Sequence, residues 1–135
     1  MAGYSSTPLA KKLGYKPGLT VHLHRAPAHY QKILALEDAK SVTWLKEPKG
    51  GVQLIHAFTT KFAELSKLLA LYRKILARDG AVWVSWPKKA AKVPTDITED
   101  RIRDAALPLG LVDIKVCAVD EVWSGLKLVI RKELR

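Results

Sequence analysis

Short apolar runs with β-branched and aromatic residues predict several strands along the chain. Four of them precede a loop rich in lysine, and they cover residues 20–24, 41–45, 52–58 and 81–86. The fourth run ends at Pro87, which lacks the amide hydrogen that a strand ladder needs. Near the C-terminus, residues 111–119 and 122–132 alternate between apolar and polar side chains, so they predict an antiparallel pair joined at Asp120 and Glu121.

Apolar residues at helical spacing lie between these runs. The predicted helices cover residues 9–13, 27–36, 61–78 and 97–107. Thr7 before Pro8 predicts the start of the first helix, and Gly14 predicts its end. The third helix has the clearest apolar face, and Asp79-Gly80 is expected to close it.

The alternation of strands and helices predicts an α/β fold in a single domain, residues 1–135. We expect a mostly parallel sheet with helices on both faces and an antiparallel strand pair at its C-terminal edge. Only about six residues connect the second and third strands, fewer than a parallel crossover between paired strands requires. These two strands are therefore either antiparallel neighbours or separated by another strand, for which the first strand is the natural candidate.

Composition adds a strong positive charge to this picture. Lysine and arginine number 23 against 13 acidic residues, which gives a net charge of +10. Such a surface attracts polyanions but does not select among nucleic acid, nucleotides and anionic lipid. Because the lysines are spread along the chain, a solubilising basic surface is the alternative.

The single cysteine excludes an intramolecular disulfide and a thiolate metal cluster. Cys117 lies in an alternating run, where we expect a buried thiol. The sequence contains neither a leader pattern at residues 1–8 nor an apolar run of about 18 residues that would cross a membrane. We therefore expect a cytoplasmic protein that does not bind membranes.

The carboxyl ends of the parallel strands predict the position of a site. Ligands of open α/β sheets gather at this edge, and a following helix adds free backbone amides and a partial positive charge. Thr60 and Asp96 are the expected caps of the two helices there, with Glu99 as the capping-box partner of Asp96. The predicted anion contacts are Arg25, Thr59, Thr60, Lys61, Lys88, Lys89 and Lys92. A solvated lysine loop is the alternative interpretation.

Other candidate chemistry is weaker. His22 and His24 point to one side of their strand and His56 lies on the third strand, but no carboxylate is placed as a further ligand, so no metal is expected. Ser85 does not lie in a nucleophile elbow, and we expect it to be structural. The indoles of Trp86 and Trp123 could stack on a base, but core packing or a dimer contact is the favoured interpretation.

Three segments resemble the frame of a class I methyltransferase: residues 16–21, the turn into a strand at 76–84, and the start of the closing hairpin at 110–112. The resemblance implies a Rossmann-like fold that binds S-adenosylmethionine over a glycine-rich turn after the first strand. Here that turn, residues 24–28, contains no glycine, and Pro27 removes an amide donor. Glu47 takes the place of the family's ribose-binding acid, or is a solvated surface carboxylate. We therefore expect neither a bound cofactor nor catalysis.

The chain also resembles a small bacterial family known only as a domain of unknown function. The resemblance rests on residues 6–14, 86–89, 95–100 and 110–126, and it implies no chemistry. Three functions stay open: a non-catalytic module that binds an anion or a nucleotide-type small molecule, a nucleic-acid-binding protein, and a structural or regulatory interaction domain that could form a homodimer.

Overall fold

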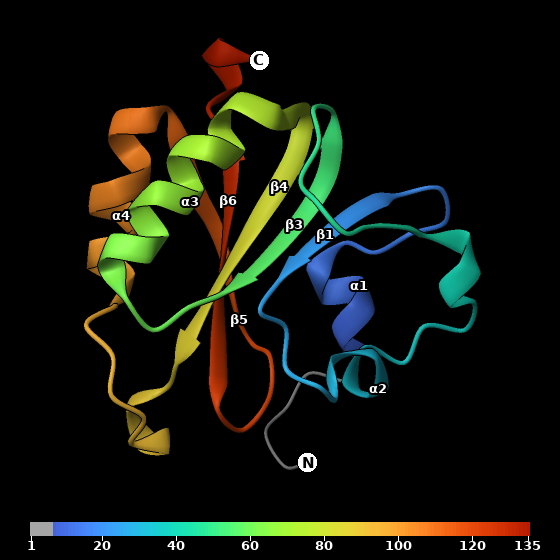
Figure 1. The fold of residues 1–135 in the computed structure, drawn as a ribbon, viewed down its shortest axis with the longest axis horizontal. Coiled ribbons are helices and arrows are strands. Elements are labelled where there is room, and N and C mark those ends of the chain that lie inside the picture. The colour runs from blue at the N-terminus through green and yellow to red at the C-terminus, as the bar shows by residue number, and fades with distance from the viewer. Residues whose placement is uncertain (1–6) are drawn as a thin grey trace.

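A computed structural model describes residues 7–135, which form one six-stranded sheet with helices on both faces (Figure 1). The strands are β1 (Thr20–His24), β2 (Thr43–Leu45), β3 (Val52–Phe58), β4 (Leu76–Pro87), β5 (Leu111–Ala118) and β6 (Trp123–Ile130). The α-helices are α1 (Leu9–Leu13), α2 (Tyr30–Leu34), α3 (Phe62–Ile75) and α4 (Glu99–Ala106). Short 3₁₀ helices are η1 (Ala39–Ser41), η2 (Lys89–Ala91), η3 (Leu107–Leu109) and η4 (Lys132–Leu134). The start of the chain, where the sequence shows no leader pattern, lies outside the described residues.

The sheet has the order β2-β1-β3-β4-β6-β5. β1 pairs in parallel with β2 and β3, β3 pairs in parallel with β4, and β6 runs antiparallel to both β4 and β5. The predicted fold class is therefore confirmed. β1 lies between β2 and β3, which is one of the two arrangements that their short connection allowed.

Each face of the sheet carries its own hydrophobic layer. Helices α3 and α4 cover one face, where Leu65 and Ile102 are fully buried, and α1 and α2 cover the other, where Leu13 and Tyr30 are buried (Figure 1). Neighbouring β4 residues divide between the layers as a strand requires, and the indole of Trp83 lies in the α1–α2 layer. Its Nε1 donates a hydrogen bond of 3.0 Å to the carbonyl of Leu13 and so ties α1 to the sheet.

A chain of four polar side chains runs through the α1–α2 layer. The hydroxyls of Tyr15 and Tyr30 are 2.8 Å apart, and the hydroxyl of Tyr30 is 2.9 Å from Nδ1 of His56. Nε2 of His56 is in turn 2.7 Å from the hydroxyl oxygen of Ser85. His56 and Ser85 are completely buried, so these bonds satisfy polar groups that water does not reach. Ser85 is structural, as the sequence predicted.

The first helix has its predicted bounds but a different capping residue, and the second is shorter than predicted. Helix α1 begins at Leu9, with Pro8 in the capping position that we expected for Thr7. Pro27 does not open α2: its carbonyl accepts the amide of Tyr30 in a turn, and the helix spans only five residues. It ends because Ala35 adopts a left-handed conformation with φ of 48°.

The boundary between α3 and β4 differs most from the prediction. The helix ends at Ile75, and β4 begins at the next residue, so Asp79 and Gly80 belong to the strand and do not close the helix. The register between β3 and β4 shifts here, from Val52 opposite Leu76 to Leu54 opposite Ala81. A Cβ on Gly80 would lie 2.9 Å from the carbonyl oxygen of Gln53. Gly80 is therefore required by a close approach of two backbones.

The structure tests two further expectations, the burial of Cys117 and the presence of membrane-spanning helices. Cys117 is only partly buried, because it lies on the edge strand β5, so the prediction of a buried thiol was wrong. Burial still raises the pKa of its thiol, against the opposing effect of the Lys12 and Lys115 charges. Among residues 7–135, no helix is both long enough and apolar enough to span a membrane.

Candidate functional site

The chain order of the sheet reverses between β1 and β3. From β1 the chain continues to β2 on one side, and it then crosses to β3 on the other. The carboxyl ends of two such strands diverge into helices on opposite faces and leave a crevice, the topological switch point, where open α/β sheets bind their ligands. Here the crevice is bordered by Arg25 after β1 and by Thr59 after β3.

A pocket of about 270 Å³ occupies this place, and we call it the switch-point pocket. It is lined by Arg25, Phe58, Thr59, Thr60, Lys61, Glu64 and Trp123. Phe58 and Trp123 meet edge to face with 5.1 Å between ring centroids, which fixes the indole at the pocket wall. The pocket therefore combines two cations, a carboxylate, two hydroxyls and an aromatic surface.

Four of the seven predicted anion contacts line this pocket, namely Arg25, Thr59, Thr60 and Lys61. The other three lie in the segment after β4, which passes through η2. The backbone amide of Lys88 donates to the carbonyl of Val122, Lys89 is exposed, and Lys92 adopts a left-handed conformation with φ of 57°. These three lysines do not line the switch-point pocket, so only part of the predicted cationic edge converges there.

The two indoles proposed as aromatic contacts have different environments. Trp123 lines the pocket and is partly exposed. Trp86 is buried in the layer beneath α3 and α4 together with Val84, which faces the same side of β4. A role for Trp86 in contacting a ligand was therefore wrong, because its ring packs in the core.

Glu64, which the sequence analysis did not select, is the electrostatic centre of the pocket. Its carboxylate accepts hydrogen bonds from the Thr59 hydroxyl at 2.6 Å and from Arg25 Nε at 3.2 Å. Nε2 of His24 lies 3.6 Å away. Burial opposes the charged form, but these hydrogen bonds and positive charges outweigh it, so the pKa of Glu64 lies below its usual value. The signal in the sequence was an acid in the first turn of α3, where the helix dipole favours it.

The amino terminus of α3 carries a cap from a distant segment. Oδ1 of Asp96 accepts the backbone amide of Phe62 at 2.7 Å, and the hydroxyl of Thr95 donates to the carbonyl of Thr60. Asp96 therefore caps α3 and not its own helix, which is capped by the hydroxyl of Thr98. The predicted caps Thr60 and Asp96, with Glu99 as partner, were wrong. The segment before α4 packs against the start of α3, and spacing along the sequence does not reveal this contact. The Asp96 carboxylate takes the amide of Phe62 that an external anion would have used.

The turn after β1 does not fit S-adenosylmethionine. It lacks the glycine that lets a cofactor approach the backbone, and its second residue, Arg25, adopts a φ of 53° while it carries a long side chain. The guanidinium of Arg25 pairs with Glu64 in the crevice. Glu47, after β2, is exposed.

The three histidines considered as metal ligands do not converge. In the parallel pairing of β1 with β3, Leu23 is opposite His56, so His56 faces the other side of the sheet from His22 and His24. Nδ1 of His22 lies 3.0 Å from the carbonyl of Leu45. Within the described part of the chain, no three histidine, cysteine or acidic side chains gather as a metal site.

Comparison with solved structures finds the same frame in methyltransferases of low sequence identity. A protein from Sulfolobus solfataricus assigned as a type 11 methyltransferase aligns over 92% of this chain and 90% of its own, with a TM-score of 0.63 and 19% identity. A SAM-dependent methyltransferase from Aquifex aeolicus covers 89% and 87%, with a TM-score of 0.62 and 16% identity. Aeropyrum pernix fibrillarin, solved with natively bound S-adenosylmethionine, covers 90% and 73%, with a TM-score of 0.55 and 14% identity. No family model and no curated protein matches the sequence. The chain therefore has a Rossmann-like, methyltransferase-like fold.

Proposed function

We propose that this chain is a non-catalytic module that binds a nucleotide-type small molecule in the switch-point pocket. The observation that carries the proposal is the convergence of Arg25, Lys61 and Trp123 at the point where this fold class binds ligands. We also keep as a proposal that the chain belongs to the small bacterial family of unknown function that its sequence resembles.

The residues that line the pocket offer contacts for the base, the phosphate and the ribose of such a ligand. The indole of Trp123 offers a flat surface for a base, and the exposed cations Arg25 and Lys61 offer charge-assisted hydrogen bonds to a phosphate. Glu64 provides carboxylate oxygens that accept from the hydroxyls of a ribose. The pocket lies just below the usual range of about 300–1,000 Å³ for small-molecule sites, which favours a mononucleotide over a dinucleotide.

Calorimetric titration with adenosine monophosphate, adenosine, inorganic phosphate and S-adenosylmethionine tests the proposal. We expect saturable binding of the nucleotide and at least about tenfold weaker binding in Arg25→Gln and Lys61→Gln, since each removes a phosphate contact. Lys67→Gln is the matched control, because Lys67 is an exposed residue of the same helix outside the pocket. Equal affinity in all three variants, or the tightest binding to S-adenosylmethionine, contradicts the proposal.

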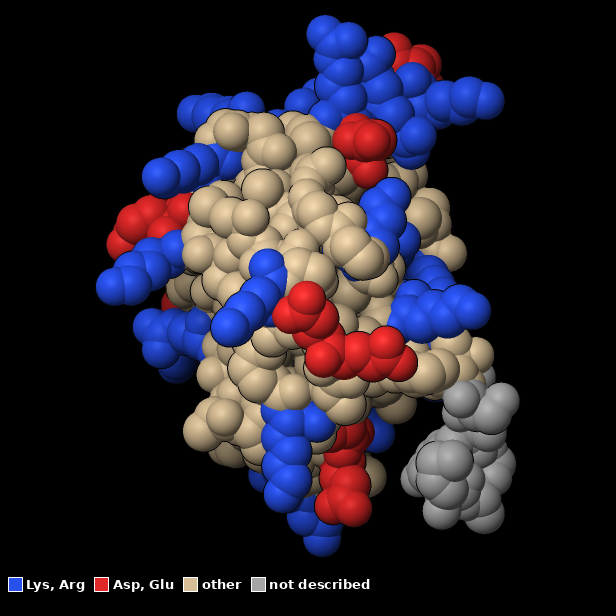
Figure 2. All heavy atoms as spheres, turned by 90° about the vertical axis from the view of Figure 1, so that its right-hand side faces the viewer, with Lys and Arg blue, Asp and Glu red and all other residues tan. Residues whose placement is uncertain are grey.

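Nucleic-acid binding is the second candidate, favoured by the net charge of +10. On the face shown in Figure 2, several basic side chains gather at the upper end, and elsewhere lysine and arginine are separated by acidic side chains and uncharged surface. If the whole surface binds a polyanion, affinity for a short duplex should fall steeply with salt and depend little on any one lysine. A flat salt response contradicts this candidate.

Self-association is the third candidate, favoured by β5. This strand lies at the edge of the sheet, and its Ile114 and Val116 side chains are 57% and 51% exposed, although an unpartnered edge strand usually avoids exposed apolar residues. Sedimentation equilibrium over a range of concentrations tests it, and a monomer at every concentration rules out a homodimer.

A further inference from the structure

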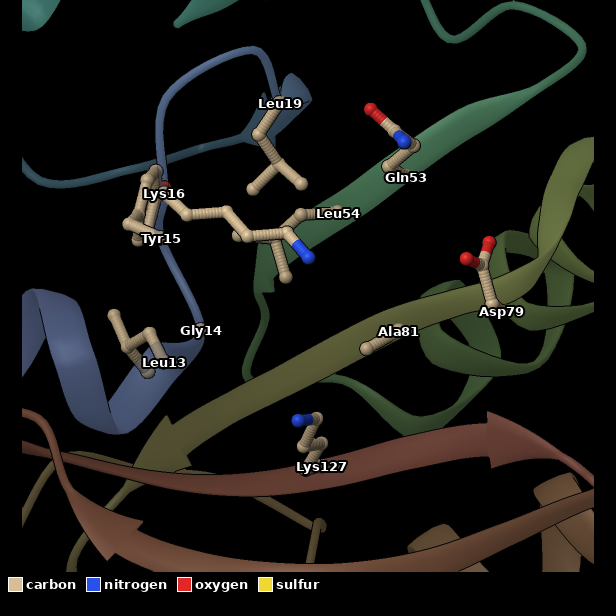
Figure 3. Close-up of a pocket in the computed structure, with 10 residues that line it drawn as sticks. All are labelled: Leu13, Gly14, Tyr15, Lys16, Leu19, Gln53, Leu54, Asp79, Ala81 and Lys127. Carbon is tan, nitrogen blue, oxygen red and sulfur yellow. The ribbon is translucent and has the colours of Figure 1, made fainter.

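A second and larger pocket lies at the opposite end of the parallel strands. It has a volume of about 410 Å³ and is enclosed by the loop after α1, the first halves of β3 and β4, and the middle of β6 (Figure 3). Its polar side chains are Tyr15, Lys16, Gln53, Asp79 and Lys127. It shares no lining residue with the switch-point pocket, so the two are separate sites.

Lys127 brings an unpaired positive charge into this pocket. It stands on β6 opposite Trp83, and its Nζ lies 3.9 Å from the position that a Cβ on Gly14 would take. Its other neighbour across the strands is Lys115, which donates to the carbonyl of Lys12 at 3.4 Å. Partial burial, followed by the charge of Lys115, lowers the pKa of Lys127. Over residues 7–135, none of Lys16, Lys115 and Lys127 forms an ion pair.

The remaining polar groups add a donor and an acceptor. Oε1 of Gln53 accepts from the backbone amide of Thr20 at 3.0 Å and from its hydroxyl at 3.3 Å. This arrangement fixes the amide and leaves its Nε2 group as a free donor. In Figure 3 the carboxylate of Asp79 is seen on β4, the side chain of Lys16 extends from the loop after α1 toward Leu54, and the side chain of Lys127 rises from β6.

A partly buried ammonium beside a second ammonium costs stability unless an anion joins it. A lysine with a purely structural role would be expected to pair with an acid or to extend into solvent. Lys127 is partly buried and pairs with no acid among the described residues, which favours a bound anion as the partner of its charge.

We propose that this pocket is a second small-molecule site, one that takes a hydroxylated oxyanion of the sugar-phosphate class. Lys16 and Lys127 hold the oxyanion, and Asp79 accepts a hydrogen bond from a hydroxyl group of the same molecule. The volume falls in the range of about 300–1,000 Å³ that small-molecule sites occupy. The proposal is independent of the function assigned to the switch-point pocket.

Calorimetric titration at fixed ionic strength with ribose 5-phosphate, inorganic phosphate, gluconate and ribose tests this site. We expect saturable binding of ribose 5-phosphate, at least about tenfold weaker binding in Lys127→Gln, and no binding of neutral ribose. Asp79→Asn should weaken the binding of ribose 5-phosphate but not that of inorganic phosphate. Binding of gluconate with an affinity equal to that of ribose 5-phosphate would contradict the assignment of the oxyanion as a phosphate.

Two controls separate this site from bulk charge and from the first pocket. Lys67→Gln and Lys61→Gln should leave ribose 5-phosphate binding unchanged, since neither residue lines the second pocket. Lys127→Gln should unfold at the same or a higher temperature than the wild type, because it removes a charge that is costly without ligand. If Lys127→Gln fails to fold, Lys16→Gln, at an exposed position, provides the same test. Absence of saturable binding to the wild type, or an equal loss in Lys67→Gln, overturns the proposal.

Discussion

Nδ1 of His56 lies 2.9 Å from the hydroxyl of Tyr30, at a depth where neither group is more than 2% exposed. Burial disfavours the charged imidazolium and lowers the pKa of His56 to about 3, against about 6.5 in an unfolded chain. The imidazole is therefore neutral in the folded protein throughout the physiological pH range, and this makes stability depend on pH.

Between pH 6.5 and pH 3 the unfolded chain binds a proton at His56 and the folded protein does not. The free energy of unfolding should therefore fall as the pH falls, by about 2 kcal/mol between pH 7 and pH 5. Urea unfolding at these two pH values measures the change. His56→Gln, which keeps a hydrogen-bonding group without a titrating one, should lose about 2 kcal/mol less over the same interval. Identical losses in both proteins would show that His56 is not responsible.

Removal of the cap on α3 should destabilise the protein. Asp96→Ala leaves the amide of Phe62 without its acceptor, and the loss of a helix cap costs about 1 kcal/mol. The measurement is the midpoint of urea unfolding. Asp104→Ala, an exposed acid on α4, is the control and should change stability by less than about 0.5 kcal/mol. Equal effects of the two substitutions would contradict the capping role.

A side chain at Gly125 should disturb the packing of Trp83. A Cβ there would lie 3.1 Å from the indole ring and 3.3 Å from Val119, so Gly125→Ala should cost about 1–3 kcal/mol. Gly50→Ala is the matched control, since a Cβ at Gly50 meets nothing within 4 Å. The thermal unfolding temperatures of the two variants should differ clearly, and a Gly125→Ala protein as stable as the wild type would show that the ring moves aside easily.

Glu64 should determine how strongly the switch-point pocket attracts a phosphate. Glu64→Gln removes the charge that pairs with Arg25, so the affinity for adenosine monophosphate should rise by about threefold to tenfold. Adenosine should bind with nearly unchanged affinity, because the glutamine carbonyl still accepts a hydrogen bond. Glu37→Gln, an exposed acid outside the pocket, is the calorimetric control. A weaker affinity for the nucleotide in Glu64→Gln would mean that the carboxylate stabilises the ligand through its ribose hydroxyls more than it competes for Arg25.

The sequence predicted the layout of the sheet better than the boundaries of its helices. The apolar runs of β3 and β4 and the alternation in β5 and β6 depend on side chains that face a core, and this local pattern survives folding. Helix α2 was predicted too long and the end of α3 too late. The carbonyl of Gln53, which approaches Gly80 closely, is distant along the chain and therefore invisible in a local pattern.

In the candidate site, too, local features could be predicted from the sequence while long-range contacts could not. Arg25 and Thr59 were predicted because each follows a strand, and the fold brings strand ends together. Glu64 and the capping role of Asp96 were missed because their importance comes from contacts across 39 and 34 residues of sequence. The pocket around Lys127 has no local signature at all, since it requires the loop after α1 to lie against β6.

The order of the strands has a consequence for how the sheet assembles. β5 joins the sheet only through β6, although β5 precedes it along the chain. During synthesis β5 therefore has no partner in the sheet until the last strand emerges and pairs with both β4 and β5. Such long-range pairing is intrinsically slow, and until it is complete one side of β4 presents an open ladder to any strand nearby. Aggregation during folding should thus depend on how quickly β6 is placed.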